Sequence, residues 1–416
     1  MRDRWTPWGW VVVLCVAVSA LIPDMGFYKP LGTDDVLPLV ATLLGAVILM
    51  VRPLPDPGPV VMVMMGLFAL GILSNIFVPE YALTPALVRG PARAGMYLIF
   101  ILGYASVVEG MNARKVLVVC SLCALIEALF GLGAFLINYS GPWQVGVYFT
   151  EEPSQSLAGT GRGRIVGTFN TSNGQGMNFV SAYLMMFVPI LFALGRTAKG
   201  MARWGWLTGT LIVAAAMLAT YTRMSLVALV GGVIVALMIL GKIKLIVSVI
   251  VGGLLALFMT PGLAQRFLDK NDRIKLYGAA IEAAFDSPWI GHGDIAYLEY
   301  IFSTSNRYHT MFGVAGSTPH NSILYAFFRY GIGGAVLSAL LLLAPILYFA
   351  VQARRRVGPA RILALAGVAS FVSFALQAQT NNLLDIPKVA FYFFALWVAL
   401  RVAVRQASTQ EAGKLN

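Results

Sequence analysis

The sequence predicts an all-α integral membrane protein with about twelve transmembrane helices. Hydrophobic residues make up 58% of the 416 residues and charged residues only 12%, and the mean hydropathy is +0.78. Soluble globular domains contain roughly 25% charged residues. The apolar residues also fall into blocks of roughly 17–25 residues, the length that crosses the hydrocarbon core of a bilayer. Such blocks are typical of membrane spans, and one soluble core has no use for so many of them.

Each apolar block is expected to form one helix. The first block, 11–22, follows a short basic segment and ends at Pro23 and Asp24 without the small-residue pattern of a signal-peptide cleavage site, so we expect it to remain as the first span. The predicted spans are 7–23, 35–51, 59–78, 92–108, 115–138, 177–195, 205–222, 224–240, 243–260, 320–350, 361–378 and 387–404.

The distribution of charge along the chain predicts the orientation of these spans. With the N-terminus in the cytoplasm, the cytoplasmic segments contain 17 of the 30 Lys and Arg residues and four acidic residues. The opposite side contains the other 13 basic residues and 13 acidic residues. Basic residues concentrate in cytoplasmic loops of membrane proteins. Both termini are therefore predicted to be cytoplasmic, and the net charge of +12 indicates membrane topology rather than a nucleic-acid partner.

Two outside loops are much longer than the others. They cover residues 139–176 and 261–319, within a chain that we expect to form a single polytopic membrane domain over 1–416. Long loops are often functional rather than connective. Neither loop is long enough for a soluble domain of ordinary size, so any chemistry is expected at the membrane surface.

All three histidines lie in or at the end of the second long loop, at His292, His309 and His320. Histidine is the natural general base near neutral pH. His320 is the strongest candidate because it lies where the chain enters the tenth span, on a rigid element at the membrane boundary. A helix-capping or interfacial role for His320 is the alternative. His292 lies in a Gly-His-Gly turn and is expected to be incidental, and the spacings between the three do not match a metal-ligand pattern.

Arginines on the outside run against the charge bias and therefore need another explanation. Arg223 lies between the seventh and eighth spans, Arg162 and Arg164 lie in a glycine-rich run, and Arg273 begins a predicted amphipathic helix. The planar guanidinium binds phosphate oxygens through two parallel hydrogen bonds. Several such groups at a membrane surface suit a lipid-linked phosphate, although pairing with acidic residues or lipid headgroups explains any one of them equally well. Glu127, within the fifth span, is a further candidate.

Five segments resemble the bacterial O-antigen ligase/polymerase superfamily of membrane glycosyltransferases, and they occur in that family's order. The segments are RIVGTFNTSN at 164–173, YTRMS at 221–225, RIKLYGAA at 273–280, SPWIGHG at 287–293, and PHNSIL with YGIGG within 319–334. Together they cover roughly residues 160–340. The second departs from the family's commoner Ser-Arg turn in having Thr222 before Arg223.

The resemblance implies a GT-C-like fold with a long periplasmic loop that contains short helices, in the bacterial inner membrane. It also implies a glycosyltransferase that takes a glycan from undecaprenyl pyrophosphate at the periplasmic face. In an O-antigen ligase, the acceptor is a sugar hydroxyl on the lipid A core, which completes lipopolysaccharide. In an O-antigen or exopolysaccharide polymerase, the acceptor is the growing glycan. A lipid-linked oligosaccharide transporter is the rival reading, but it predicts charged residues in the middle of several spans and an internal repeat.

The resemblance also assigns roles to residues. His320 would accept the proton of the acceptor hydroxyl, and Arg223 and Arg273 would hold the pyrophosphate and stabilise its developing charge. Arg162 and Arg164 would assist in substrate binding, and Asn321 would orient the acceptor. No metal and no other cofactor is expected, because arginines supply the positive charge. Attack opposite the leaving group would invert the anomeric centre.

Overall fold

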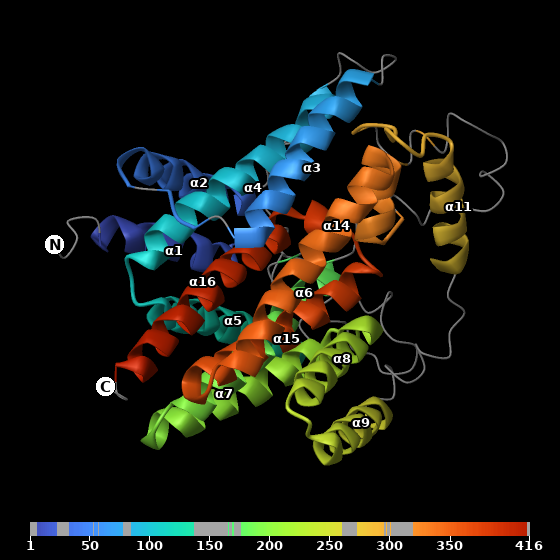
Figure 1. Ribbon diagram of the computed structural model, residues 1–416. Helices are drawn as coiled ribbons and strands as arrows, with labels where there is room; N and C mark the ends of the chain where they lie inside the picture. Colours follow the sequence, from blue (N-terminus) through green and yellow to red (C-terminus); the bar gives the residue numbers. More distant parts are fainter. Residues whose placement is uncertain are drawn as a thin grey trace.

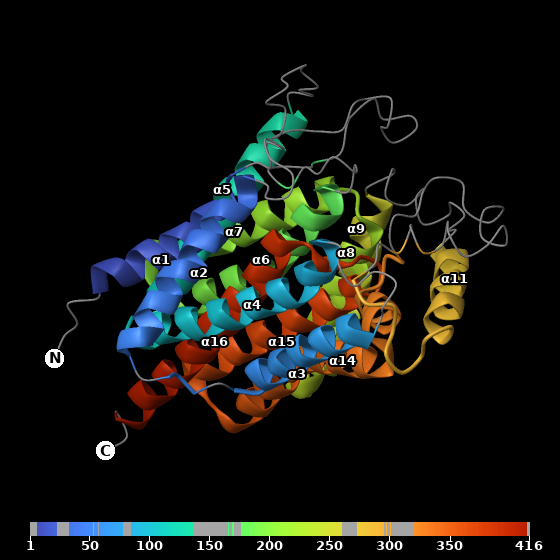
Figure 2. The same cartoon turned by 90° about the horizontal axis from the view of Figure 1, so that it is seen from above.

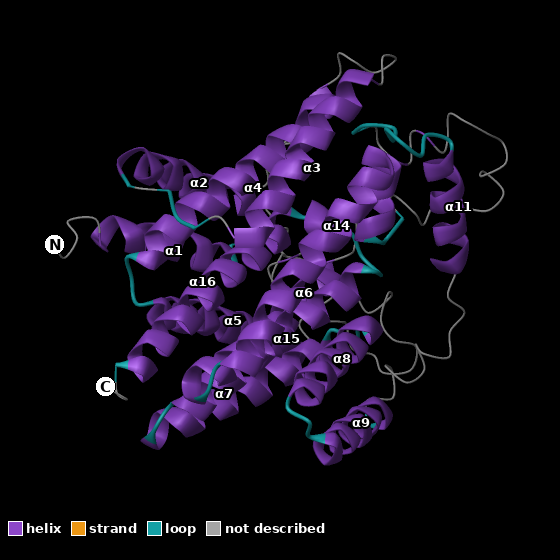
Figure 3. Cartoon of the chain, viewed as in Figure 1, coloured by secondary structure: helices purple, strands orange, loops and turns teal. Residues whose placement is uncertain are grey.

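The computed structural model is an all-helical bundle (Figures 1 and 3). It describes residues 6–22, 33–52, 54–56, 58–77, 85–136, 165, 169, 176–259, 273–294, 297, 300 and 319–413. Within these residues there are thirteen α-helices and no strand. The helices are α1 (Thr6–Ser19), α2 (Thr33–Val51), α3 (Gly58–Phe77), α4 (Pro85–Glu109), α5 (Ala113–Leu136), α6 (Gly176–Thr197), α7 (Gly200–Ala219), α8 (Arg223–Ile239), α9 (Ile243–Phe258), α11 (Arg273–Phe285), α14 (Ser322–Arg355), α15 (Gly358–Ala378) and α16 (Pro387–Ala412), with the short 3-10 helix η4 (Leu383–Asp385) before α16.

The twelve predicted spans correspond one to one with twelve of these helices, so the predicted fold class is confirmed. Eight of the helices are long and apolar enough to cross a membrane. In hydrocarbon each backbone N–H and C=O needs a partner within the protein, and a helix supplies these partners within one segment, which is why apolar blocks of this length form helices. The thirteenth helix, α11, is the amphipathic helix predicted to begin at Arg273. The chain is thus a multi-pass membrane protein.

Two helices form the centre of the bundle. In the most apolar stretch of α6, 83% of the residues are buried inside the protein, and the corresponding figure for α16 is 94%. Aromatic rings fill the space between α14, α15 and α16, where Trp397 contacts the rings of Phe349 and Phe371 edge-on. By contrast, α9 lies at the periphery (Figure 1). The central helices therefore owe their position to contacts with other helices rather than with lipid.

Different parts of the chain lie at the two ends of the bundle. Both chain termini lie at one end, here called the terminal end, and α11 lies at the other, here called the α11 end (Figures 1 and 2). At the terminal end Arg401 pairs with Asp56, and Arg405 pairs with Glu109 at 3.2 Å. These residues all belong to segments predicted to share the cytoplasmic side. The structure therefore groups the connecting segments as the charge pattern predicts.

Helix α14 is kinked near its start. Its 34 residues correspond to about 51 Å of helix, well beyond a hydrocarbon core of about 30 Å. Tyr330 and Gly331 have non-helical backbone angles, and Gly331 has φ +65° and ψ −163°. The part after the kink is long enough to span the membrane alone. The part before it, Ser322 to Arg329, lies at the α11 end.

The loop that follows α11 docks on this kink and satisfies its backbone. The amides of His292 and Gly293 donate to the carbonyls of Phe328 and Arg329 at 2.9 and 2.8 Å, and the amide of Ile332 donates to Pro288 at 2.8 Å. These bonds replace helical bonds that the kink removes. The predicted Gly-x-Gly turn is therefore a structural clamp between α11 and α14.

His292 holds the same clamp through its side chain. Its Nε2 donates to the carbonyl of Ala283 at 2.8 Å, and its ring stacks on Phe328 with centroids 4.8 Å apart. Burial lowers the pKa of His292 below its ordinary value of 6.5, although the bond to Ala283 and the nearby Asp286 oppose this shift. His292 was expected from the sequence to be incidental to catalysis. The contacts of the His292 side chain are those of a packing residue.

Replacing Gly331 with alanine is expected to destabilise the protein strongly. A β-carbon at this position would run into the carbonyl of Trp289 and lie 2.7 Å from that of Pro288, and φ +65° disfavours any L side chain. We expect a loss of about 3 kcal/mol or more in stability, measured as a lower Tm of the purified protein. Gly252→Ala is the control, because a β-carbon there meets nothing within 4 Å. Equal Tm values for the two variants would contradict this role of the kink.

Acidification is expected to weaken the clamp through His292. A histidine whose pKa is lowered on folding binds fewer protons in the folded protein than in the unfolded chain. Its stabilising contribution is complete above about pH 6.5 and is lost as the pH falls through the lowered pKa. The Tm of the wild type should therefore fall between about pH 7.5 and pH 5.5 by more than the Tm of His292→Gln. If the Tm of the two proteins falls equally over this pH range, His292 is not the titrating group.

Candidate active site

Asn321 fixes the start of α14, next to His320. Its side-chain oxygen accepts hydrogen bonds from the amides of Ile323 and Leu324 at 2.9 and 3.0 Å. Asparagine is among the preferred residues at this position because it satisfies amides that have no partner within the helix. Its Nδ2 donates to the carbonyl of Gln379 at 3.2 Å. The first turn of α14 is thereby tied to the end of α15.

His320 has a strained backbone. It is 9% exposed, and its φ is +51°. Among the described residues, only Tyr221 is another non-glycine residue with positive φ. Each such conformation costs about 1–3 kcal/mol, and it persists only where the surroundings enforce it. These outliers cluster at active sites, and here they lie at His320 and two residues before Arg223.

The turn that carries Arg223 is held by several hydrogen bonds. Arg223 is the first residue of α8 and is partly buried. Before it, the hydroxyl of Thr222 donates to the carbonyl of Met177 at 3.4 Å. After it, Ser225 donates to Gln377 on α15 at 2.9 Å. The N-terminus of α8 therefore adds its positive dipole to the guanidinium of Arg223.

The end of α15 joins the predicted elements. Gln377 receives the hydrogen bond from Ser225, and the carbonyl of Gln379 accepts both from Asn321 and from the hydroxyl of Tyr277 on α11, the latter at 2.7 Å. The Arg223 turn, α11 and the His320 turn thus converge on three consecutive residues. We call this convergence the candidate active site.

Several predicted residues lie outside the part of the chain that the structure describes. They are Arg162, Arg164 and His309, together with the side chain of Arg273. The backbone of Arg273 begins α11. Ile165, the residue after Arg164, is described: it is buried, and its amide donates to the carbonyl of Ala219 at the end of α7 at 3.3 Å. Among the described residues no three His, Cys, Asp or Glu side chains gather as metal ligands.

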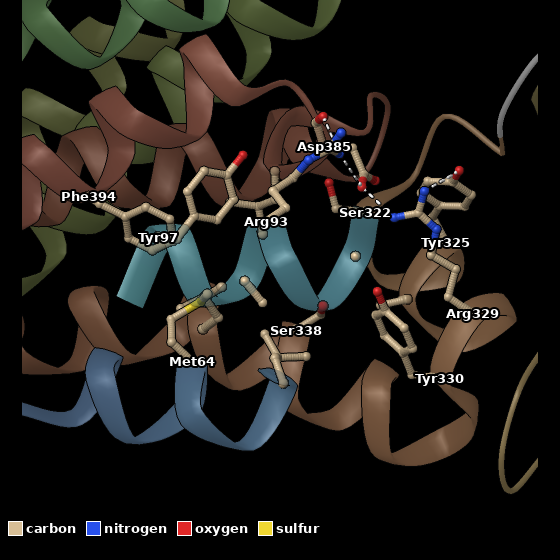
Figure 4. Close-up of a pocket in the computed structure, with 16 residues that line it drawn as sticks. Met64, Arg93, Tyr97, Ser322, Tyr325, Arg329, Tyr330, Ser338, Asp385 and Phe394 are labelled. Atoms are coloured by element: carbon tan, nitrogen blue, oxygen red, sulfur yellow. Dashed lines mark hydrogen bonds and ion pairs between the residues drawn. The ribbon is translucent and has the colours of Figure 1, made fainter. Parts of the chain in front are cut away.

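A polar cleft lies beside the candidate active site (Figure 4). It has a volume of about 90 Å³ and lies between α3, α4, α14, η4 and α16. Its polar lining residues are Arg93, Ser322, Arg329, Tyr330, Ser338 and Asp385, and its apolar lining residues include Met64, Leu67, Ala94, Tyr97, Ala326 and Phe394. Ser322 belongs to both sites, because it follows Asn321 and its hydroxyl donates to the carbonyl of Asn381 at 3.1 Å.

Ion pairs hold the charged side chains of the cleft. Arg329 donates to Asp385 at 2.7 Å, and its Nε lies 3.6 Å from Asp294. Arg93 donates to the backbone carbonyl of Asp385 at 3.0 Å, and its Nη1 lies 3.7 Å from the carboxylate (Figure 4). Asp294 also accepts from the hydroxyl of Tyr330 at 3.0 Å. Two guanidinium groups therefore face two carboxylates, and the formal charges cancel.

None of the residues that line this cleft was predicted as a site residue from the sequence. Arg93 and Arg329 belong to the same set of outside arginines that singled out Arg223, so the opposing charge bias was a usable signal for both. Asp385 and Asp294 had no such signal, since acidic residues are common on that side. The two aspartates gain their arginine partners only when segments that are distant in the sequence pack together in the fold.

A comparison with known families bears on these residues. Residues 208–339 match the family model described as O-antigen ligase. The match contains the Arg223 turn, α11, the Gly-His-Gly turn, His320 and the kink of α14, but it does not extend to Arg162 and Arg164. No curated protein sequence matches the chain. The match supports, over residues 208–339, the resemblance to the O-antigen ligase-like superfamily that the order of the sequence motifs predicted.

Proposed function

We propose that the protein is an O-antigen ligase. It would transfer a glycan from undecaprenyl pyrophosphate to a sugar hydroxyl of the lipid A core, at the periplasmic face of the bacterial inner membrane. The family match over residues 208–339 supports a glycosyltransferase-type membrane enzyme. The α11 end contains the candidate active site, so we assign this end to the periplasm.

The observation that carries the proposal is the backbone of His320. A buried histidine with φ +51° is held at the start of α14 by the cap of Asn321 and by the end of α15. A purely capping role does not need this conformation, because Asn321 itself supplies the cap. The strain instead supports a side chain that is held in a defined position for chemistry.

The proposed reaction is a direct displacement. His320 takes the proton of the acceptor hydroxyl as its oxygen attacks the anomeric carbon, and the bond from that carbon to the pyrophosphate oxygen breaks. Arg223 and Arg273 bind the pyrophosphate and stabilise the charge that it gains, with Arg162 and Arg164 assisting. Attack from the opposite face inverts the anomeric centre. Because arginines carry the charge stabilisation, the proposal includes no metal.

Asn321 has two functions in this proposal. Its Oδ1 is occupied by two amides, and one Nδ2 hydrogen is used by Gln379. Since the amide group has two hydrogens, one is left to orient the acceptor hydroxyl toward His320. The same side chain thereby positions the base and the substrate.

The decisive experiment supplies purified protein with an undecaprenyl-pyrophosphate glycan. With lipid A core present, we expect the glycan to appear on the core together with free undecaprenyl pyrophosphate. Without lipid A core, we expect no glycan product. Longer glycans formed without the core would identify a polymerase of the same superfamily instead, and the absence of any transfer with either acceptor would reject the glycosyltransferase proposal.

His320→Gly is expected to abolish most of the activity without unfolding the protein. Glycine adopts φ +51° without strain, so Tm should be unchanged or higher. Loss of a general base should lower kcat by about 10²–10⁴-fold, and added imidazole should restore part of the activity. His320→Gln is the matched control, because it blocks the vacated space and should not respond to imidazole. Activity near that of the wild type in both variants would exclude His320 as the base.

A further inference from the structure

The cleft beside the candidate active site has the wrong charge for a pyrophosphate. Arg93 and Arg329 both face Asp385, and Arg329 also faces Asp294. A phosphate entering this cleft would meet the carboxylate of Asp385, and both arginines are already engaged in ion pairs, Arg329 also with Asp294, which does not line the cleft. Arg223 is set apart from this cluster, on α8, where the helix dipole favours an anion. The cleft therefore suits a neutral ligand.

The lining of the cleft is suited to a sugar ring. Carboxylate oxygens accept and guanidinium groups donate hydrogen bonds in fixed planar geometries, which match neighbouring hydroxyl groups on a ring. The lining also includes the aromatic side chains of Tyr97 and Phe394, which can pack on the apolar face of a sugar. A few polar groups within a mainly apolar lining are typical of small-molecule sites.

The connection between α15 and η4, which precedes the lining residues Leu384 and Asp385 in the sequence, contains further buried polar groups. Asn381 and Asn382 are 1% and 7% exposed. The Oδ1 of Asn381 and both polar side-chain atoms of Asn382 have no hydrogen-bond partner among the described residues. Buried amides are almost always hydrogen-bonded, so such groups indicate a missing polar partner. The same connection continues into Leu384 and Asp385, which line the cleft.

The cleft also lies at the correct place for an acceptor. Ser322 lines it and is two residues from His320, within the same turn at the start of α14. A hydroxyl at this edge of the cleft is close to the proposed base, whereas the Arg223 turn approaches from α8. Donor and acceptor would then reach His320 from different helices.

We infer that this cleft is the acceptor subsite, which binds the sugar ring whose hydroxyl is glycosylated. Arg93, Arg329 and Asp385 would recognise ring hydroxyls, and Asn381 and Asn382 would complete the hydrogen bonding. The inference rests on the proposed function for its role in the reaction. Binding of a sugar to the cleft can nevertheless be measured without any transfer.

The test compares two alanine-to-leucine variants on α4. Ala94 lines the cleft, whereas Ala92, on the same helix, is exposed and does not. Saturation-transfer NMR in nanodiscs would measure Kd for two probes, the lipid-free core oligosaccharide and the lipid-free repeat-unit oligosaccharide. We expect Ala94→Leu to raise the Kd of the bound probe by about tenfold or more and Ala92→Leu to leave it unchanged. Whichever probe binds the wild type identifies the acceptor.

Equal Kd values for the wild type and Ala94→Leu, or no binding of either sugar to the wild type, would overturn the inference. If Ala94→Leu does not fold, Arg93→Gln replaces it, since the Arg93 side chain is 31% exposed at the rim, and an unchanged Kd in that variant would be equally decisive. Sugar binding that Ala94→Leu weakens, without glycan transfer by the wild type, would support the subsite and reject the proposed function.

Discussion

The structure depends on one constraint, which is that backbone polar groups within a bilayer need partners inside the protein. The twelve apolar blocks satisfy it as helices. The kink of α14 breaks it at Tyr330 and Gly331, and the amides of His292 and Gly293 restore the lost bonds. The loop after α11 is therefore required by the kink, because its amides replace helical hydrogen bonds that the kink removes.

This docking has consequences for the candidate active site. It places α11 against the first turn of α14, and Tyr277 of α11 then shares the carbonyl of Gln379 with Asn321. The same end of α15 binds Ser225, two residues after Arg223. A defect in the clamp would thus disturb His320 and the Arg223 turn together. The contacts that stabilise the kink therefore also help to fix the positions of the site residues.

The site combines two electrostatic environments. The Arg223 turn joins a guanidinium to the N-terminus of α8, which favours an anionic group. Beside Ser322, the cleft residues Arg93 and Arg329 pair with Asp385, and Arg329 also pairs with Asp294 outside the lining, so the charges of these ion pairs balance. In the proposed reaction, the lipid pyrophosphate donor would occupy the first environment and the sugar acceptor the second. His320 lies in the turn that borders the cleft, where a proton has to move if the proposed reaction is correct.

The sequence by itself determined the fold class, the positions of the twelve helices that match the predicted spans, and the helix α11, because hydropathy and helix periodicity are local properties. It also singled out His320 and Arg223 as candidates, because a rare residue type and a charge against the topology bias are visible without a structure. The pairing of Arg93, Arg329, Asp294 and Asp385 was decided only by the tertiary structure, since Arg93 and Asp385 are 292 residues apart. The strained backbone of His320 likewise follows from how α14 and α15 pack. Local sequence does not encode which helices become neighbours, and in this protein the neighbours form the cleft.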